Sequence, residues 1–240
     1  MLVSIAISTF ESGGKGAEML NYALHSIMRQ TYKNIEIVIS DHSKDDKIEY
    51  EIKKFPNLNI KYVRYEKNYG SNSCNTNNAI NNCNGELIKI LFMDDYLYSS
   101  HAIQKIVNAF EKNKNIYWLV NSYWHTYDRI RLGRLHCPKW NKNLIKGINT
   151  IGCPSNLTIR NTVKERFDEN LIWLMDCEYY WRLKQKYGLP IFYNEPLNVQ
   201  LLHKNQLTNK GAKQRERNEL KYIQEKILNH SGGIRSCSSP

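Results

Sequence analysis

The apolar residues of the first 120 positions follow two alternating patterns. Nearly continuous apolar runs, rich in β-branched residues, predict strands at residues 2–8, 35–39, 60–65, 87–93 and 116–120. Apolar residues spaced three or four apart predict a helix at residues 19–28, and further helices are predicted at residues 75–82 and 102–110. Strands that alternate with helices are typical of a mostly parallel sheet covered on both faces. We therefore expect an α/β fold that binds ligands at the carboxyl ends of its strands.

The second half of the chain has a less regular pattern. A turn leading into a strand is predicted at residues 152–160, a helix is expected to begin near Asp176, and another apolar run precedes His203. Residues 213–228 combine a narrow apolar stripe with a basic face, which predicts a helix, and residues 231–240 are expected to form a frayed tail.

Composition narrows the class of protein. The 240 residues are 41% hydrophobic, which is enough for a full core. No stretch approaches the roughly 18–20 consecutive apolar residues of a membrane span, and the N-terminus lacks the features of a signal peptide, so we expect a cytoplasmic location. The six cysteines are irregularly spaced and include no Cys-x-x-Cys, which argues against a zinc site and against a disulfide framework.

A formal net charge of +11 suits an anionic partner: a nucleotide, a nucleic acid or an acidic membrane surface. The basic residues are scattered along the chain instead of being clustered with aromatic residues on one element, which argues against nucleic acid. A nucleotide and a peripheral contact with the inner face of a membrane both stay open.

Small or acidic residues follow each of the first four predicted strands. They are Thr9 and Glu11, Asp41 and Ser43, Asn68 and Gly70, and Asp94 and Asp95. Because the carboxyl ends of parallel strands meet at one edge, we expect these residues to converge on one cleft. Two adjacent carboxylates repel each other, so the Asp94-Asp95 pair also suggests a bound cation.

Taken together, these segments resemble those of family 2 glycosyltransferases. The segments that carry the resemblance, in the order seen in that family, are residues 3–10, 23–32, 35–43, 68–70, 85–88 and 94–95. The family consists of inverting enzymes of GT-A fold that use nucleotide-sugar donors. The resemblance implies a GT-A domain over residues 1–210, with a nucleotide-sugar half at 1–100 and an acceptor half at 101–210. Residues 211–240 would form a basic C-terminal helix and tail.

The resemblance also implies roles for individual donor-side residues. Thr9, Phe10 and Glu11 would surround the base and ribose, and Asp41 would hydrogen-bond the base. Asn68 and Gly70 would order a loop on the phosphate side, although Asn-x-Gly is first of all a turn signal. Asn75 would line the donor cleft, with helix capping as the alternative.

The resemblance also implies a bound divalent cation, Mn²⁺ or Mg²⁺. Asp94 would face the ribose and the metal, Asp95 would ligate a cation that bridges the diphosphate, and His203 would return to the metal or diphosphate. The family usually shows Asp-x-Asp here, whereas this chain has Phe92-Met93-Asp94-Asp95 and therefore one acid fewer.

An inverting transferase needs a carboxylate that takes the proton from the acceptor hydroxyl. Asp176 and Glu178, flanked by Trp173 and Trp181, match the acid pair that inverting relatives place at the start of a helix. We expect Asp176 to be the base. The alternative is that Asp176 is only an N-cap and Glu178 a solvated surface acid.

The expected acceptor is a hydroxyl of a glycan or of a lipid-linked intermediate, and UDP is the expected nucleotide. Trp118, Trp124 and Tyr127 form either an acceptor platform or part of the core. The basic C-terminal helix could pack on the domain, dock on an acidic membrane or pair with a second subunit, so a homo-oligomer stays open.

Two other functions compete with this expectation. A nucleotidyltransferase would carry a Gly-rich, basic loop after the first strand, and Gly13-Gly14-Lys15-Gly16 is a partial match. A degenerate transferase that only binds glycan is the other alternative, because the acidic motif is reduced.

Overall fold

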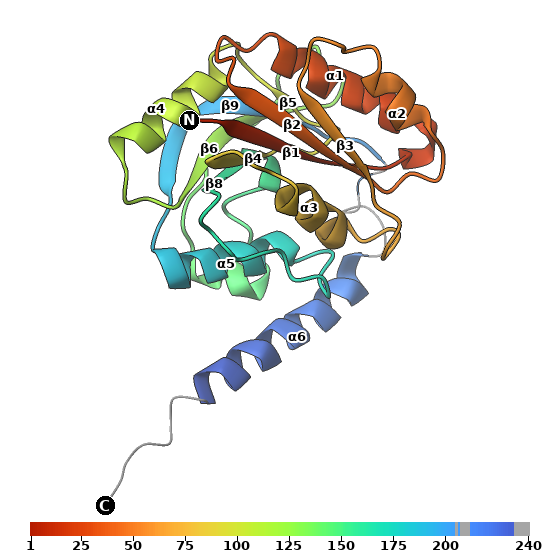
Figure 1. Ribbon diagram of the computed structural model, residues 1–240. Helices are drawn as coiled ribbons and strands as arrows, with labels where there is room; N and C mark the ends of the chain where they lie inside the picture. Colours follow the sequence, from red (N-terminus) through yellow and green to blue (C-terminus); the bar gives the residue numbers. More distant parts are fainter. Residues whose placement is uncertain (205, 207–211, 233–240) are drawn as a thin grey trace, which may run out of the picture.

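The computed structural model describes residues 1–204, 206 and 212–232, which fold around one mixed sheet (Figure 1). Within these residues the strands follow the order β3-β2-β1-β4-β8-β6-β9-β5, with β7 paired to β6. The bounds are β1 Val3–Thr9, β2 Ile35–Asp41, β3 Ile60–Arg64, β4 Leu87–Ile90, β5 Tyr96–Leu97, β6 Trp118–Thr126, β7 Leu135–His136, β8 Leu157–Arg160 and β9 Ile191–Leu201. The first four strands are parallel, as the alternating pattern predicts.

Helices cover both faces of the sheet. Their bounds are α1 Gly16–Met28, α2 Lys47–Ile52, α3 Asn72–Asn81, α4 Ala102–Lys112, α5 Met175–Tyr187 and α6 Ala212–Gly232. Helices α1, α2 and α4 bury their apolar residues in one core cluster, and α3, α5 and α6 contribute to a second cluster on the opposite face (Figure 1). The α/β class is therefore confirmed, while the short helix α2 and the two-residue strands β5 and β7 have no counterpart in the sequence analysis.

The second half of the chain reverses direction within the sheet. Strand β8 is antiparallel to both β4 and β6, so β6 again runs parallel to β4. Strand β9 is parallel to β6. As a result, the carboxyl ends of β1, β4, β6 and β9 all lie at the same edge of the sheet, although the chain reaches that edge from very different sequence positions.

The sequence offers Trp118 and Trp124 of β6, and Tyr127 just after it, either as an acceptor platform or as part of the core. Trp118 is fully buried in the second cluster, where its ring stacks on that of Tyr180 and its indole N–H donates to the Gly188 carbonyl. Tyr127 lies beyond the strand and is 77% exposed. Trp118 therefore belongs to the core.

Helix α6 packs on the domain. Leu220, Ile223 and Ile227 of its apolar stripe contact the second core cluster, and Ile223 is buried. The stripe is thus covered by the chain's own domain. No helix among the described residues has the length and apolar character needed to cross a membrane.

The first turn of α1 approaches the backbone of residue 10 so closely that only glycine fits. A Cβ atom on Gly16 would lie 2.1 Å from the carbonyl oxygen of Phe10. We expect Gly16→Ala to lower the free energy of unfolding by about 1–3 kcal/mol, because the rigid backbone must shift. Urea unfolding measures this.

Gly133→Ala is the matched control, since its Cβ would meet no atom closer than 3.4 Å. We expect no loss of stability there, and a gain of up to about 1 kcal/mol from reduced freedom of the unfolded chain. Equal losses at both positions would contradict the steric explanation.

Candidate functional site

One cavity of about 430 Å³ opens at the carboxyl edge of the sheet. Its lining includes eight of the residues singled out from the sequence: Phe10, Glu11, Gly70, Asn75, Asp94, Asp95, Asp176 and His203. Of the eight strand-end residues expected to converge, four line the cavity: Glu11, Gly70, Asp94 and Asp95. Thr9, Asp41, Asn68 and Glu178 are absent from the lining.

Thr9 and Asp41 are buried behind the cavity, where they join the ends of β1 and β2. The Asp41 carboxylate accepts hydrogen bonds from the Thr9 hydroxyl at 3.1 Å, the Tyr62 hydroxyl at 2.8 Å and the Ser43 amide at 2.9 Å. Arg64 adds a charge contact at 3.6 Å. With its oxygens engaged in this way, Asp41 holds the ends of β1, β2 and β3 together.

Three ring side chains form an aromatic wall of the cavity, of which the sequence analysis missed His42 and Tyr69. His42 and Tyr69 line the cavity together with Phe10, which is 41% exposed. The Tyr69 hydroxyl donates to the Glu11 carboxylate, and His42 stacks on Tyr65 with ring centroids 4.9 Å apart. Desolvation lowers the pKa of His42, which favours its neutral form. The position of His42 directly after a strand was the available signal.

The loop before α3 turns the backbone toward the cavity. Asn68 and Gly70 both have positive φ, and the Asn68 side chain donates to the Cys74 sulfur, so Asn68 shapes the turn. Ser71 is the N-cap of α3 and accepts a hydrogen bond from the Cys74 amide. Gly70, Ser71 and Asn72 line the cavity, which therefore receives the N-terminus of a ten-residue helix.

Asp94 and Asp95 differ sharply in environment. Asp95 is 2% exposed, and its oxygens accept from the Leu201 amide at 3.0 Å and the Cys153 thiol at 3.6 Å. Burial first, and then the neighbouring Asp94, raise its pKa well above the usual range. Asp94 keeps about a fifth of its side chain exposed, and its Oδ2 lies 3.0 Å from Nε2 of His203. All three residues line the cavity, but Asp94 is more exposed than Asp95 and pairs with His203.

A buried lysine, Lys89, stabilises the turn before β8, which contacts the segment after β4. Lys89, in the middle of β4, donates to the Ser155 carbonyl at 2.6 Å and to the Asn121 side chain at 3.1 Å. Burial lowers its pKa to about 7. The Ser155 hydroxyl in turn accepts from the Phe92 amide at 2.9 Å, so the turn before β8 is fastened to the end of β4.

Asp176 also lines the cavity. It is the second residue of α5, whose N-cap is Leu174, so the N-cap interpretation of Asp176 is wrong. Its oxygens accept from the Asn149 side-chain amide and from the Cys177 backbone amide, both at 2.7 Å. Desolvation raises its pKa to about 6, which keeps the carboxylate ionised but basic at neutral pH.

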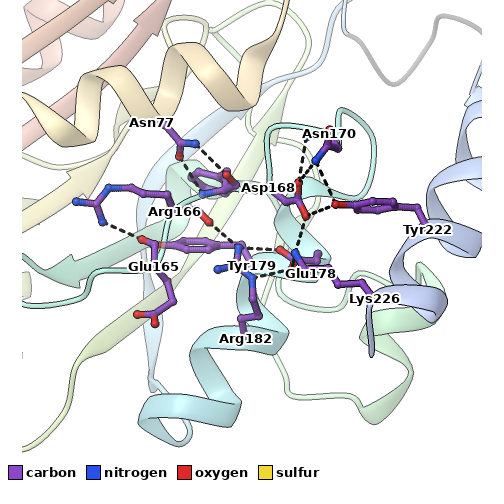
Figure 2. A network of polar contacts seen from close by, with 11 residues as sticks. Asn77, Glu165, Arg166, Asp168, Asn170, Glu178, Tyr179, Arg182, Tyr222 and Lys226 are labelled. Atoms are coloured by element: carbon purple, nitrogen blue, oxygen red, sulfur yellow. Dashed lines mark hydrogen bonds and ion pairs between the residues drawn. The ribbon is translucent and has the colours of Figure 1, made fainter. Parts of the chain in front are cut away.

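Glu178 lies outside the cavity and is 2% exposed, so it is not a solvated surface acid. Its carboxylate lies 2.6 Å from Arg182 and 2.7 Å from Lys226 of α6. Figure 2 shows these contacts. Lys226 also reaches Asp168 at 2.5 Å, and the Tyr222 hydroxyl donates to Asp168 at 3.0 Å. Glu178 therefore ties α5 to α6 and has no contact with the cavity.

A second contact from α6 supports the cavity wall directly. The Glu219 carboxylate, 7% exposed, accepts from the backbone amides of Ile172 at 3.0 Å, Trp173 at 2.9 Å and Leu174 at 2.8 Å. These amides precede α5, where a helix leaves N–H groups without intrahelical partners. Ile172 and Trp173 line the cavity, so α6 holds one of its walls.

The described residues contain no group of three or more His, Cys, Asp and Glu side chains that could hold a metal ion by themselves. Asp94 and His203 offer one carboxylate and one imidazole. Such a set fits Mn²⁺ or Mg²⁺ only if a bound substrate supplies further oxygen ligands, which is how Mg²⁺ is commonly held beside phosphates.

Comparison with known proteins points to one family. The model of "Glycosyl transferase family 2" matches residues 4–177. An uncharacterized glycosyltransferase of Rickettsia typhi, RT0329, is 28% identical over 229 residues, which cover 91% of this chain and 69% of that protein.

Two solved structures share the fold. Staphylococcus aureus TarS 1–349 in complex with UDP-GlcNAc has a TM-score of 0.70 at 16% identity, covering 95% of this chain and 67% of that one. The Pyrobaculum calidifontis mannosyltransferase PcManGT, in complex with GDP-Man and Mn²⁺, has a TM-score of 0.61 at 14% identity, covering 100% and 66%. The chain thus spans about two thirds of the length of these three proteins, and the expected GT-A fold is confirmed.

The contact of Glu219 with three backbone amides makes a stability prediction. Glu219→Ala leaves these buried donors without their charged acceptor, and we expect the free energy of unfolding to fall by about 2–3 kcal/mol. Amide hydrogen exchange at residues 172–174 should also become faster. Urea unfolding and exchange by mass spectrometry measure the two effects.

Glu225→Ala on the same helix is the matched control. Glu225 is exposed, and its ion pair with Lys221, at 3.9 Å, is long and exposed as well. We expect a change within about 0.5 kcal/mol there. Unaltered exchange at residues 172–174 in Glu219→Ala would refute the supporting role of α6.

Proposed function

This chain belongs to glycosyl transferase family 2, and on that premise we propose that it moves a sugar from a UDP-sugar to a hydroxyl of a glycan or lipid-linked acceptor, with inversion at the anomeric carbon. The observation that carries the proposal is that one cavity is lined both by the Asp94–His203 pair and by Asp176. A leaving diphosphate and an attacking hydroxyl need these two kinds of group on opposite sides of one sugar.

We assign the nucleotide of the donor to the aromatic wall of the cavity. Phe10, His42 and Tyr69 offer ring faces for a base, and the N-terminus of α3 at Ser71 offers backbone N–H groups for a phosphate. The complexes of TarS with UDP-GlcNAc and of PcManGT with GDP-Man support a nucleotide-sugar donor.

For the metal, the exposure of the two acids favours Asp94 over Asp95. Asp94, Asp95 and His203 all line the cavity, but both oxygens of Asp95 are engaged with Leu201 and Cys153. We therefore assign the metal contact to Asp94 and His203 and give Asp95 a positioning role. When bound, Mn²⁺ or Mg²⁺ would offset the negative charge of the departing nucleoside diphosphate.

Asp176 is the proposed base. In an inverting displacement the acceptor oxygen forms its bond to the anomeric carbon while the bond to the diphosphate oxygen breaks and the hydroxyl proton passes to the carboxylate. The hydrogen bond from Asn149 holds one Asp176 oxygen at 2.7 Å, which orients the carboxylate. A pKa near 6 gives it more proton affinity than an ordinary aspartate.

The metal assignment is tested by thermal shift with UDP and Mn²⁺. At about one hundred times the dissociation constant, we expect a rise in Tm of roughly 5 °C or more, because only the folded chain binds the ligand. Asp94→Asn should abolish the part of the shift that depends on Mn²⁺, and chelation should do the same for the wild type.

Glu111→Gln on α4, far from the cavity, should respond like the wild type. A Mn²⁺-dependent shift that survives in Asp94→Asn would refute the assignment. If the wild type shows neither a nucleotide response nor turnover of any nucleotide sugar, the transferase proposal fails and a glycan-binding protein is left.

The base assignment is tested by UDP release from a panel of UDP-sugars. We expect Asp176→Asn to lower kcat by about 10²- to 10⁴-fold while the thermal shift with UDP is unchanged. The wild-type rate should rise as the pH is raised through about 6, because the carboxylate must lose its proton before it can accept one. A pH profile that is flat between 5 and 8, or full activity in Asp176→Asn, would exclude Asp176 as the base.

A further inference from the structure

The connection between β6 and β7 exposes an unusual number of apolar side chains. The exposed fractions are 77% for Tyr127, 85% for Ile130, 42% for Leu132 and 37% for Leu135. Isolated apolar residues on a surface need no explanation. Four exposed apolar side chains within nine positions of one hairpin are unusual, because their contact with water is unfavourable.

The hairpin is held in place by its own contacts. Oδ1 of Asp128 accepts from the amides of Ile130 and Arg131, both at 2.9 Å. The Arg129 guanidinium lies 4.3 Å from the ring centroid of Tyr22 on α1, which fastens the hairpin to the domain. Ile130 is therefore directed into solvent by a hydrogen-bonded turn.

The charge of the same segment is positive. Residues 127–135 contain Arg129, Arg131 and Arg134 against the single acid Asp128, and Arg131 and Arg134 are exposed. Apolar and aromatic side chains flanked by arginines suit the interface of an anionic bilayer, which takes the apolar groups between its headgroups and attracts the cations. A nucleic acid or phosphate polymer would use the arginines but leave Ile130 in water.

The hairpin lies beside the cavity. Strand β6 runs parallel to β4, so its carboxyl end at Thr126 lies at the edge where Asp94 is found. Thr126 pairs with Leu201 in β9, two residues before His203 of the cavity lining. A surface that docks through residues 127–135 would therefore lie near the cavity.

We propose that residues 127–135 dock on an anionic lipid bilayer and bring the cavity close to acceptors that are anchored in it. The docking is independent of the reaction, and only the lipid-linked acceptor rests on the proposed function. This surface differs from the apolar stripe of α6, which the domain itself covers.

The test is cosedimentation of the full chain with phosphatidylcholine vesicles, with and without phosphatidylglycerol. We expect binding only when phosphatidylglycerol is present. Ile130→Ser combined with Leu132→Ser should weaken it roughly tenfold or more, and Arg131→Gln combined with Arg134→Gln by about fivefold per arginine. Controls at the opposite edge of the sheet, Leu189→Ser and Lys112→Gln with Lys114→Gln, should bind like the wild type.

Three results would overturn the proposal: no sedimentation of the wild type, an equal loss in the control variants, or full vesicle binding by the Ile130/Leu132 variant. If only the arginine variant loses binding and inorganic polyphosphate competes, the surface recognises an anionic polymer and the lipid proposal is wrong. The UDP thermal shift, measured on every variant, confirms folding. Its absence in the wild type would refute the proposed function without altering the vesicle result.

Discussion

The buried carboxylate of Asp95 is the interaction on which the geometry of the cavity depends. It joins the segment between β4 and β5 to the end of β9 through the Leu201 amide, and to the turn before β8 through Cys153 and Ser155. Burying a carboxylate costs several kcal/mol, and the hydrogen bonds that Asp95 accepts offset only part of that cost, since its pKa stays well above the usual range. Because Asp94 precedes Asp95 and His203 follows Leu201 by two residues, the same contact brings Asp94 and His203 to 3.0 Å.

The part of the cavity lining formed by Ile172 and Trp173 depends on charged residues from much later in the chain. Glu219 of α6 accepts from amides some 45 positions earlier, and Lys226 joins Asp168 to Glu178 (Figure 2). Removing one member of such a buried group leaves its partners unsatisfied, which is more costly than losing an exposed ion pair. The C-terminal helix is therefore part of the cavity's support, and a stable wall at Ile172 and Trp173 gives the proposed base Asp176 a fixed position.

Local patterns predicted the first half of the fold well, because strand and helix periods there reflect burial on one or two faces. The rule that ligands bind at strand ends also brought Phe10, Glu11 and Asp94 to one cavity. The same rule could not tell that Thr9 and Asp41 point behind it, since that depends on Tyr62 and Arg64 in the neighbouring strand. Glu178 and Glu219 were beyond local reasoning for a similar reason: their partners are set by the packing of α6.

An acidic motif with one acid fewer than the family usually shows can still belong to a metal site, because the two remaining acids would have different roles. Asp95 supplies the buried hydrogen bonds, which leaves Asp94 as the oxygen donor that the cavity can use. In the proposed metal site, His203 would add a nitrogen donor in place of a further carboxylate. Imidazole is a better ligand for transition metals than for Mg²⁺, whereas carboxylate and phosphate oxygens suit Mn²⁺ and Mg²⁺ alike. The mixed donor set therefore favours Mn²⁺ over Mg²⁺ as the cation that this cavity would hold beside a diphosphate.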